Sequence, residues 1–253
     1  MRVVIIGTGN AATSLARLMQ ARGHVIEQVY GRDILKSEAL AEQVNARPVS
    51  RLSLLSRNAD IYLIAVSDKA VKTIVEELQV NDQLVLHTTA SLSQHVLREA
   101  STRYGVLYPL QSLRKEMDVE TTVPFIVDGN SEAVTLEVES FARTLSHTVV
   151  RAGDQVRVKL HVAAVFACNF SNYMYLLSES FCRKEALDFS LLQPLIEETA
   201  TRLREFSPRE VFTGPAVRGD IETINKHLSL LEAYPQLHEM YKALTEKIMD
   251  QAK

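Results

Sequence analysis

Glycines near the start of the chain have the spacing of a phosphate-binding turn. The segment Gly7-Thr8-Gly9-Asn10-Ala11-Ala12 follows the short apolar run Val3 to Ile6. The first glycine permits a tight turn, the second lets the backbone approach a pyrophosphate at a helix N-terminus, and Ala12 is small enough for close packing. The alternative is a glycine turn that binds no nucleotide. We expect a dinucleotide to contact Gly7, Thr8, Gly9, Asn10 and Ala11.

The residue after the second apolar run indicates which dinucleotide is bound. Arg32 lies twenty residues past Ala12, just beyond the run Val25 to Tyr30. NAD-binding proteins place a carboxylate there for the ribose hydroxyls, and a guanidinium pairs with the 2′-phosphate of NADP instead. The sequence therefore predicts NADP as the cofactor. In the alternative, Arg32 is a solvated loop residue and Asp33 reaches the ribose.

Two further apolar runs lead into small polar residues. Ser67 follows the run Ile61 to Val66, and Thr88 follows the run Leu84 to His87. Ligands of open α/β sheets bind outside the carboxyl ends of the strands. We therefore expect Val66, Ser67 and Thr88 to border the cofactor as well.

Hydride transfer to a carbonyl or an imine also needs a proton donor. His87, at a strand end, and His161, near the start of a long helix, have suitable chemistry, because histidine titrates near neutral pH. Lys159 is predicted to anchor a substrate carboxylate. The long helix follows directly on the last strand, so we expect its first turns to face His87 at the nicotinamide end of the cofactor. A structural role between domains is an equal alternative for His161.

Three later residues are predicted to bind substrate, and no metal site is predicted. Asn169 shares a helix face with Lys159 but lies about 15 Å away along the axis, so the two cannot hold one atom. Arg218 and His227 are possible anion-binding and proton-carrying groups. In the alternative, Gly214 to Asp220 is a structural turn in which Arg218 pairs with Asp220.

Alternating short β-branched runs and amphipathic stretches up to residue 152 are typical of a mostly parallel sheet covered by helices. The remaining strands are predicted at Val106 to Tyr108, Pro124 to Val127 and Thr148 to Val150. The helices are predicted at Ala11 to Ala21, Leu35 to Val44, Lys69 to Leu78, Ser93 to Ser101 and Glu132 to Leu145. The sequence thus predicts an α/β, Rossmann-type, doubly wound NADP-binding domain over residues 1–152.

After Gly153 the strand pattern stops, and residues 153–253 are predicted to form an all-helical substrate and dimerisation domain. Its helices are expected at Asp154 to Arg183, Leu191 to Glu205, Ile221 to Glu232 and Pro235 onward. The active site is expected in the cleft between the domains. Apolar residues spread around the first of these helices predict a homodimer. They include Val162, Val165, Phe166, Phe170, Leu176 and Leu177.

Composition limits the classes of partner. The chain has 253 residues and a formal net charge of −3, without the basic stripe of a nucleic-acid-binding protein. No leader sequence and no apolar run of membrane-spanning length are recognised, so a cytoplasmic protein without a membrane partner is expected. Cys168 and Cys182 are too far apart on one helix to form a disulfide bond.

Several motifs resemble known families. The N-terminal part is similar to the NADP-binding domains of pyrroline-5-carboxylate reductase, ketopantoate reductase and deazaflavin-dependent NADP reductases. The segments Tyr108 to Ser112, Lys159 to Asn169 and Gly214 to Asp220 look like those of an uncharacterised family. That family joins such a domain to a helical domain of unknown function related to the C-terminal domain of 6-phosphogluconate dehydrogenase. The resemblance implies an oxidoreductase, often dimeric, with no implied substrate.

The match to this family is incomplete. His87 fits the family pattern, whereas Tyr108 stands where the family has a histidine. The lysine and asparagine one helical turn apart in related 3-hydroxyacid dehydrogenases are also missing, because Ala163 follows Lys159 by one turn. The sequence predicts an NADP-dependent reductase or dehydrogenase acting on a small carbonyl or imine. The alternative is a non-catalytic NADP-binding protein that senses the cofactor or presents its helical domain to a partner.

Overall fold

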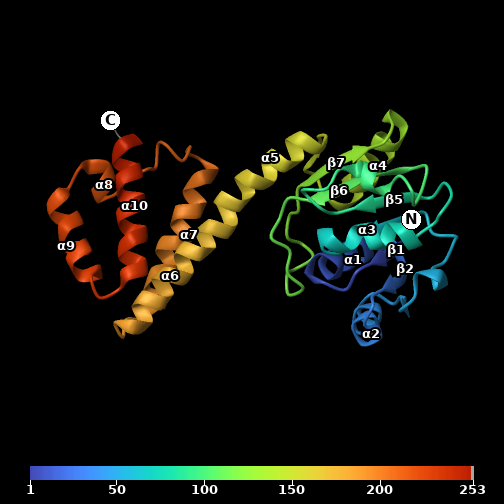
Figure 1. Cartoon of the computed structure of the whole chain (residues 1–253), viewed down its shortest axis with the longest axis horizontal. Helices are drawn as coiled ribbons and strands as arrows, with labels where there is room; N and C mark the ends of the chain where they lie inside the picture. Colours follow the sequence, from blue (N-terminus) through green and yellow to red (C-terminus); the bar gives the residue numbers. More distant parts are fainter. Residues whose placement is uncertain (252–253) are drawn as a thin grey trace. The chain divides into compact units, whose positions relative to one another are not determined.

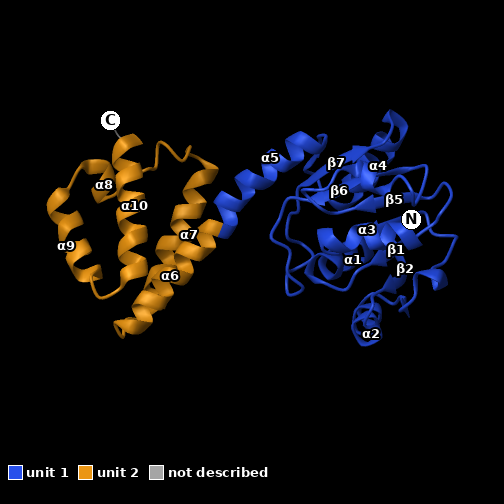
Figure 2. Ribbon diagram, viewed as in Figure 1, with its two compact units in different colours: residues 1–169 blue, residues 170–253 orange. Residues whose placement is uncertain are grey.

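The computed structural model describes residues 1–251 and divides the chain into two compact units (Figures 1 and 2). The first unit is Met1–Asn169 and the second begins at Phe170. The sheet ends at Arg151, close to the domain boundary predicted at 152/153, and the first unit also holds the start of the helix that follows.

The first unit contains an eight-stranded sheet in the order β3-β2-β1-β4-β5-β6-β7-β8. Strands β1 to β6 run parallel, β7 is antiparallel to β6, and β8 is parallel to β7. This is the predicted mostly parallel, Rossmann-type arrangement. The strands are β1 Arg2–Ile6, β2 Val25–Tyr30, β3 Arg47–Val49, β4 Ile61–Ile64, β5 Leu84–His87, β6 Tyr104–Pro109, β7 Phe125–Gly129 and β8 Val149–Arg151.

Alternating residues of the strands fill two cores on opposite faces of the sheet. On β1, Val3 and Ile5 belong to one core, while Val4 and Ile6 belong to the other. All four side chains are fully buried. Strands that are covered on both faces read as continuous apolar runs, and this is why their positions were predictable.

Helices of the first unit cover both faces. They are α1 Asn10–Ala21, α2 Ile34–Gln43, α3 Asp68–Glu77, α4 Glu132–Leu145 and α5 Asp154–Ala164. The helix predicted over Ser93 to Ser101 is wrong, because only the 3-10 turn Gln94–Leu97 forms. The carbonyl of Ala100 accepts from the N–H of Val80, so the chain turns back here to enter β6.

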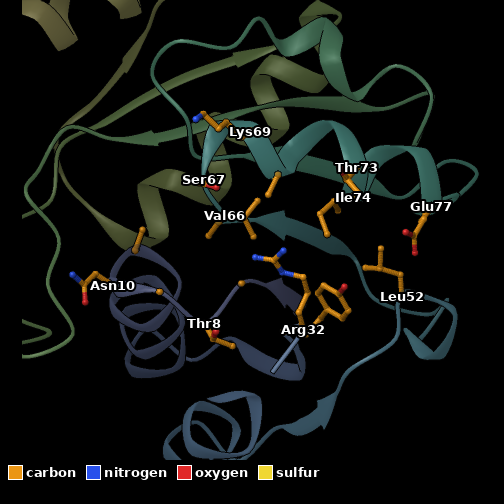
Figure 3. A pocket seen from close by; sticks show the side chains of 17 residues that line it. Thr8, Asn10, Arg32, Leu52, Val66, Ser67, Lys69, Thr73, Ile74 and Glu77 are labelled. Carbon is orange, nitrogen blue, oxygen red and sulfur yellow. The ribbon is translucent and has the colours of Figure 1, made fainter. Parts of the chain in front are cut away.

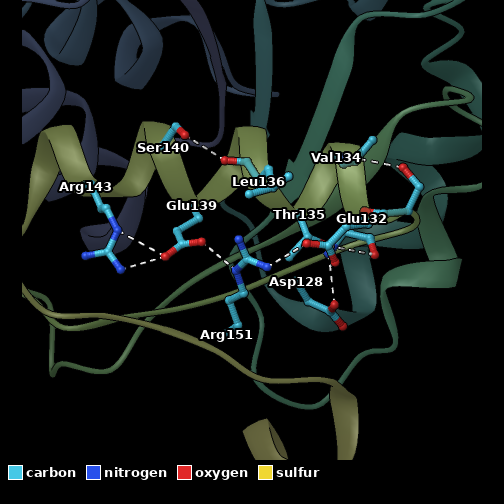
Figure 4. Close-up of polar contacts among 11 residues, drawn as sticks. Asp128, Glu132, Val134, Thr135, Leu136, Glu139, Ser140, Arg143 and Arg151 are labelled. Carbon is cyan, nitrogen blue, oxygen red and sulfur yellow. Dashed lines mark hydrogen bonds and ion pairs between the residues drawn. The ribbon is translucent and has the colours of Figure 1, made fainter.

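Ion pairs fasten the last strand to α4 (Figure 4). Arg151 on β8 donates to Glu132 at 2.8 Å and to Glu139 at 2.5 Å. Arg143, one turn after Glu139, donates to the same carboxylate. These hydrogen bonds lower the pKa of Glu139. The network holds the sheet edge from which α5 starts.

The second unit is helical. Its helices are α6 Ser171–Lys184, α7 Gln193–Thr201, α8 Pro215–Arg218, α9 Ile221–Leu231 and α10 Pro235–Gln251. Between α5 and α6 lies a π-helical segment, Val165–Phe170, so the region Asp154 to Lys184 is helical throughout. Contrary to the expectation from sequence, this region is long and apolar enough, by length and composition only, to cross a membrane.

Few side chains are buried within the second unit. In the described part of this unit, the buried residues are Cys182, Ile224 and Thr245. Leu191, just before α7, is 76% exposed, and Leu195, on α7, is 63% exposed. A helical domain normally buries one apolar stripe per helix, so these helices present apolar faces that the chain itself does not cover.

Candidate functional site

A cavity of about 680 Å³ opens at the carboxyl edge of the sheet, above β2, β1 and β4 (Figure 3). This is the edge at which open α/β sheets bind nucleotides. Eight of the nine residues predicted to bind the cofactor line it. The lining consists of Gly7, Thr8, Gly9, Asn10, Ala11, Tyr30, Gly31, Arg32, Leu52, Ala65, Val66, Ser67, Lys69, Ala70, Thr73, Ile74 and Glu77.

The glycine turn has the geometry that a pyrophosphate requires. Gly7 has φ +137°, and a Cβ on it would lie 2.2 Å from the carbonyl oxygen of Ala65, so only glycine fits. A Cβ on Gly9 would meet nothing within 4 Å, because that side faces the cavity. Helix α1 starts at Asn10 with no side-chain cap, which leaves its N-terminus available to an anion. These residues fit a dinucleotide.

Arg32 and Asp33 have different surroundings. Arg32 is exposed, lines the cavity and points into it (Figure 3). The carboxylate of Asp33 accepts from the N–H of Leu35 at 3.1 Å and lies 3.7 Å from the ammonium of Lys36. Asp33 thus caps α2 and is not among the described residues that line the cavity.

Five residues of α3 that were not predicted line the same cavity, and three of them have polar side chains. Lys69, Thr73 and Glu77 follow one another at intervals of four residues, which places them on one face of the helix. This spacing after the polar residue Ser67 was visible in the sequence and is the signal that sequence reasoning missed. Thr88, by contrast, is buried and its N–H donates to the carbonyl of Ile64. It lies outside the described lining of the cavity.

His87 closes β5 and is fully buried. Burial, and next the positive charge of Arg157, lower the pKa of His87 to about 4. The N–H of Thr89 donates to Nδ1 of His87 at 3.2 Å. The ring is therefore neutral at neutral pH, and its proton lies on Nε2. A neutral, buried imidazole is a poor proton donor.

The charge beside His87 comes from a residue that was not predicted. Arg157 on α5 is fully buried, and it donates to the carbonyls of Ala90 at 3.2 Å and Leu92 at 2.5 Å. Its ion pair with Asp154 measures 2.8 Å. The only feature of the sequence that points to this ion pair is that Asp154 and Arg157 are three residues apart.

The path of α5 follows from the position of β8. Strands β7 and β8 run opposite to β1–β6, and Arg151 at the end of β8 lies level with Val127 and Leu107, midway along β6. Helix α5 starts three residues later, at Asp154.

The first turn of α5 brings Arg157 to the carbonyls of Ala90 and Leu92 in the loop after β5. One turn later His161 meets Tyr108, whose Oη lies 3.0 Å from Nδ1 of His161. The first turn of α5 therefore lies at the loop that follows His87, as expected from the sequence. That this segment faces the nicotinamide end of a cofactor stays a prediction.

The other predicted residues are spread over both units. Lys159 is exposed on α5. Asn169 is exposed in the π-helical segment, whose extra residue per turn breaks the face that Asn169 was predicted to share with Lys159. In the second unit, Arg218 ends α8, and Nδ1 of His227 lies 2.8 Å from Oη of Tyr241.

Comparison with protein families gives two matches. Residues 2–91 match the family described as NADP oxidoreductase, coenzyme F420-dependent. Residues 123–248 match a domain of unknown function, DUF2520. A comparison with curated proteins finds no match.

Comparison with solved structures gives matches over nearly the whole chain. A Bacteroides fragilis protein provisionally named an NADP oxidoreductase is 34% identical, with a TM-score of 0.89 and coverage of 98% of each chain. A 1-pyrroline-5-carboxylate reductase from Streptococcus pyogenes is 16% identical, with a TM-score of 0.66 over 100% of this chain and 98% of that one. A reductive aminase from Aspergillus terreus, solved with NADPH and ethyl levulinate, is 16% identical, with a TM-score of 0.74 over 99% and 94%.

The last two likenesses show the fold, a Rossmann-like domain followed by a helical region. The first, at 34% identity over nearly both whole chains, shows the family. The chain belongs to the NADP oxidoreductase family in which a Rossmann-like NADP-binding domain is joined to a DUF2520 domain.

Proposed function

We propose that the protein is an NADP-dependent reductase that transfers a hydride between NADP(H) and a small carbonyl or imine compound. The observation that carries this proposal is the position of Arg32, which points into the cavity that the glycine turn opens. The fold is shared with an imine reductase solved with NADP⁺ and with the reductive aminase above, and this supports the substrate class.

A preference for NADP over NAD follows from the surroundings of Arg32. Its guanidinium is placed to make charge-assisted hydrogen bonds with a 2′-phosphate. The carboxylate of Asp33 caps α2, so it is less available to accept hydrogen bonds from a ribose. Glu77 lines the opposite end of the cavity from Asn10 (Figure 3) and is the one carboxylate among the described lining residues.

Calorimetric titration with NADPH and NADH tests this preference. We expect NADPH to bind at least about 10-fold more tightly, and Arg32→Ser to lose about 10-fold to 100-fold in NADPH affinity while NADH affinity stays unchanged. Arg98→Ser is the control, since Arg98 is an exposed arginine paired only with Glu99 at 3.9 Å. Equal affinities for the two cofactors in the wild-type protein would contradict the proposal.

Among the predicted catalytic residues, His161 is the proposed proton donor. The nicotinamide of the bound cofactor supplies or receives the hydride. His161 is exposed, whereas His87 is buried and its pKa is lowered to about 4. Lys159, two residues before His161, is the proposed anchor for a substrate carboxylate. Asn169, Arg218 and His227 remain the proposed substrate-binding groups.

A screen of small keto acids and cyclic imines with NADPH tests catalysis. Oxidation of NADPH that depends on one of these compounds would support a reductase. Tight binding of NADPH with no turnover of any compound would instead favour a protein that senses the cofactor.

We also propose that the protein forms a homodimer through its helical region. Apolar side chains there are exposed, among them Phe166, Leu176, Leu191 and Leu195, and a second copy of the chain would cover them. A membrane is the less suitable partner, because Asn169, Asn172 and Ser178 would then place polar groups in lipid. A cytoplasmic location is proposed together with the dimer.

A further inference from the structure

A tyrosine and a histidine form a hydrogen-bonded pair at the carboxyl edge of the sheet. Oη of Tyr108 lies 3.0 Å from Nδ1 of His161, and the two rings meet edge to face with centroids 6.1 Å apart. Tyr108 is 8% exposed, whereas His161 is exposed on α5. The pair thus has one fixed, buried member and one member that can meet a ligand.

Packing fixes the buried member. Tyr108 belongs to a small core with Ala90, Val106 and Ile126, against which Leu160 of α5 also packs. Burial raises the pKa of Tyr108, so the phenol keeps its proton at neutral pH. A phenol donates one hydrogen bond and accepts others. Tyr108 can therefore donate to an unprotonated Nδ1 of His161 or accept from a protonated one.

The strands whose ends form the candidate cofactor site are followed in the sheet by the strand that carries Tyr108. Gly9 follows β1, Ser67 follows β4, Thr88 follows β5, and Tyr108 is near the end of β6, and these four strands are neighbours in that order. Strands lie about 4.8 Å apart, so β6 is about 10 Å from β4. If Arg32 holds the 2′-phosphate of the adenosine half, the reactive half of a bound dinucleotide would extend toward this pair.

Resting on the reductase function proposed above, we propose that Tyr108 is a positioning residue that orients the proton-donating ring of His161. In the doubly protonated ring, the Nδ1–H donates to Oη of Tyr108, which leaves the Nε2–H directed away from the protein core. The hydrogen bond to Tyr108 thereby fixes the orientation of the His161 ring and the direction in which its Nε2–H can donate a proton.

The proposed step balances as follows. A hydride would leave a C–H bond of NADPH with its electron pair, so that NADPH is oxidised to NADP⁺. The hydride bonds to the substrate carbon, which is reduced, and the π electrons of the C=N or C=O bond move to the nitrogen or oxygen. That atom takes the proton from Nε2 of His161, the imine becomes an amine or the carbonyl an alcohol, and the imidazolium becomes imidazole. Water then returns a proton to Nε2.

The charged groups near the pair in the described chain lie on α5. They are Arg157, whose positive charge opposes the rise in the pKa of Tyr108, and Lys159, two residues before His161.

The same strand offers a matched control. Tyr104, at the other end of β6, lies 3.1 Å from Nδ1 of His95 through its Oη, and those rings are also edge to face. Because β6 is parallel to β5, Tyr104 lies at the amino edge, away from the cofactor cavity. Tyr104→Phe therefore removes the same type of hydrogen bond without touching the proposed site.

Two measurements test the pairing. The first is ¹⁵N NMR of the histidine rings as pH is varied, with His161→Gln used to assign its signal. Tyr108→Phe should change the tautomer ratio of His161, and Tyr104→Phe should change only that of His95. The second is turnover of NADPH with 2-methyl-1-pyrroline and with a panel of keto acids. Tyr108→Phe should lower kcat by about 10-fold with little change in KM and alter the pH profile, and His161→Gln should lower kcat by about 100-fold.

The outcomes separate this inference from the proposed function. Wild-type turnover that persists undiminished in Tyr108→Phe, with an unchanged His161 tautomer ratio, overturns the pairing and leaves the reductase in place. Wild-type protein that binds NADPH but reduces nothing in the panel overturns the reductase, and the pairing falls with it.

Discussion

The guanidinium of Arg157 is fully buried and reaches the carboxylate of Asp154 across 2.8 Å, one turn earlier on α5. Burial alone would raise the pKa of Asp154, but hydrogen bonds from Ser93 and Arg157 outweigh it, and the pKa lies below its usual value. The pair joins the first turn of α5 to the loop after β5, since Arg157 also donates to Ala90 and Leu92.

Breaking this pair should destabilise the first unit. Asp154→Asn leaves the charge of Arg157 buried without its counter-ion, and we expect the free energy of unfolding to fall by about 3 kcal/mol. Arg157→Met should cost less, because it removes the charge itself. Urea denaturation of the two single variants and the double variant measures the coupling. Glu222→Gln, which breaks the exposed pair with Lys226, serves as the control. An Asp154→Asn variant as stable as that control would refute the prediction.

His87 should make stability depend on pH. Its pKa is lowered from 6.5 to about 4 on folding, so the unfolded chain binds more protons between these values. Its contribution is therefore fully present above pH 6.5 and is lost as pH falls toward 4. We expect the wild type to lose about 2 kcal/mol more than His87→Gln between about pH 7 and pH 5. His24, whose pKa is also lowered, is common to both proteins, so parallel pH profiles would show that His87 is not the source.

The two glycines of the turn should respond differently to the same substitution. Gly7→Ala places a Cβ 2.2 Å from a backbone oxygen at a positive φ, so we expect a loss of about 3 kcal/mol or more in stability. Gly9→Ala meets no protein atom within 4 Å and should leave the melting temperature nearly unchanged. It should nevertheless weaken NADPH binding by about 10-fold, because the methyl group occupies the path of the pyrophosphate. Thermal melting and calorimetry separate the two effects, and unchanged NADPH affinity in Gly9→Ala would place the pyrophosphate elsewhere.

The proposed dimer makes a prediction about mass. Light scattering should give about twice the 28.3 kDa of one chain. Replacing Leu191 and Leu195 together by Glu should reduce that mass to one chain's if this apolar face is covered by a second copy. Leu35→Glu is the matched control, since Leu35 is 71% exposed on α2 of the first unit. A wild-type mass of a single chain at micromolar concentration would exclude the dimer.

The sequence predicted best the elements whose side chains are buried on both faces or form one apolar stripe. Strands β2 and β5 and helix α4 have the predicted limits. Strand β3 was missed because it has three residues, Arg47–Val49, with a proline at its centre. A period of 3.6 residues also cannot reveal the π-helical segment at Val165–Phe170, where the turn takes one residue more.

The residues of the candidate cofactor cavity were more predictable than the surroundings of the proposed catalytic groups. Its residues lie in turns whose glycine pattern reports backbone geometry directly, and eight predicted residues gather there. The buried state of His87 depends on tertiary neighbours, above all Arg157, which no local pattern reveals. The pairing of Tyr108 with His161 likewise depends on the antiparallel course of β7 and β8.

Helix α5 runs from the loop after β5 to Tyr108 on β6, and the spacing of its residues sets which groups they meet. Each residue of the helix advances about 1.5 Å, so the position of a side chain along α5 sets where it lies relative to the strand ends. Arg157 reaches the loop after β5, and His161, one turn later, reaches Tyr108. Deleting a single residue between Asp154 and Arg157 would shift and rotate everything that follows, including His161. The length of one short helical stretch therefore sets the position of the proposed proton donor relative to the sheet.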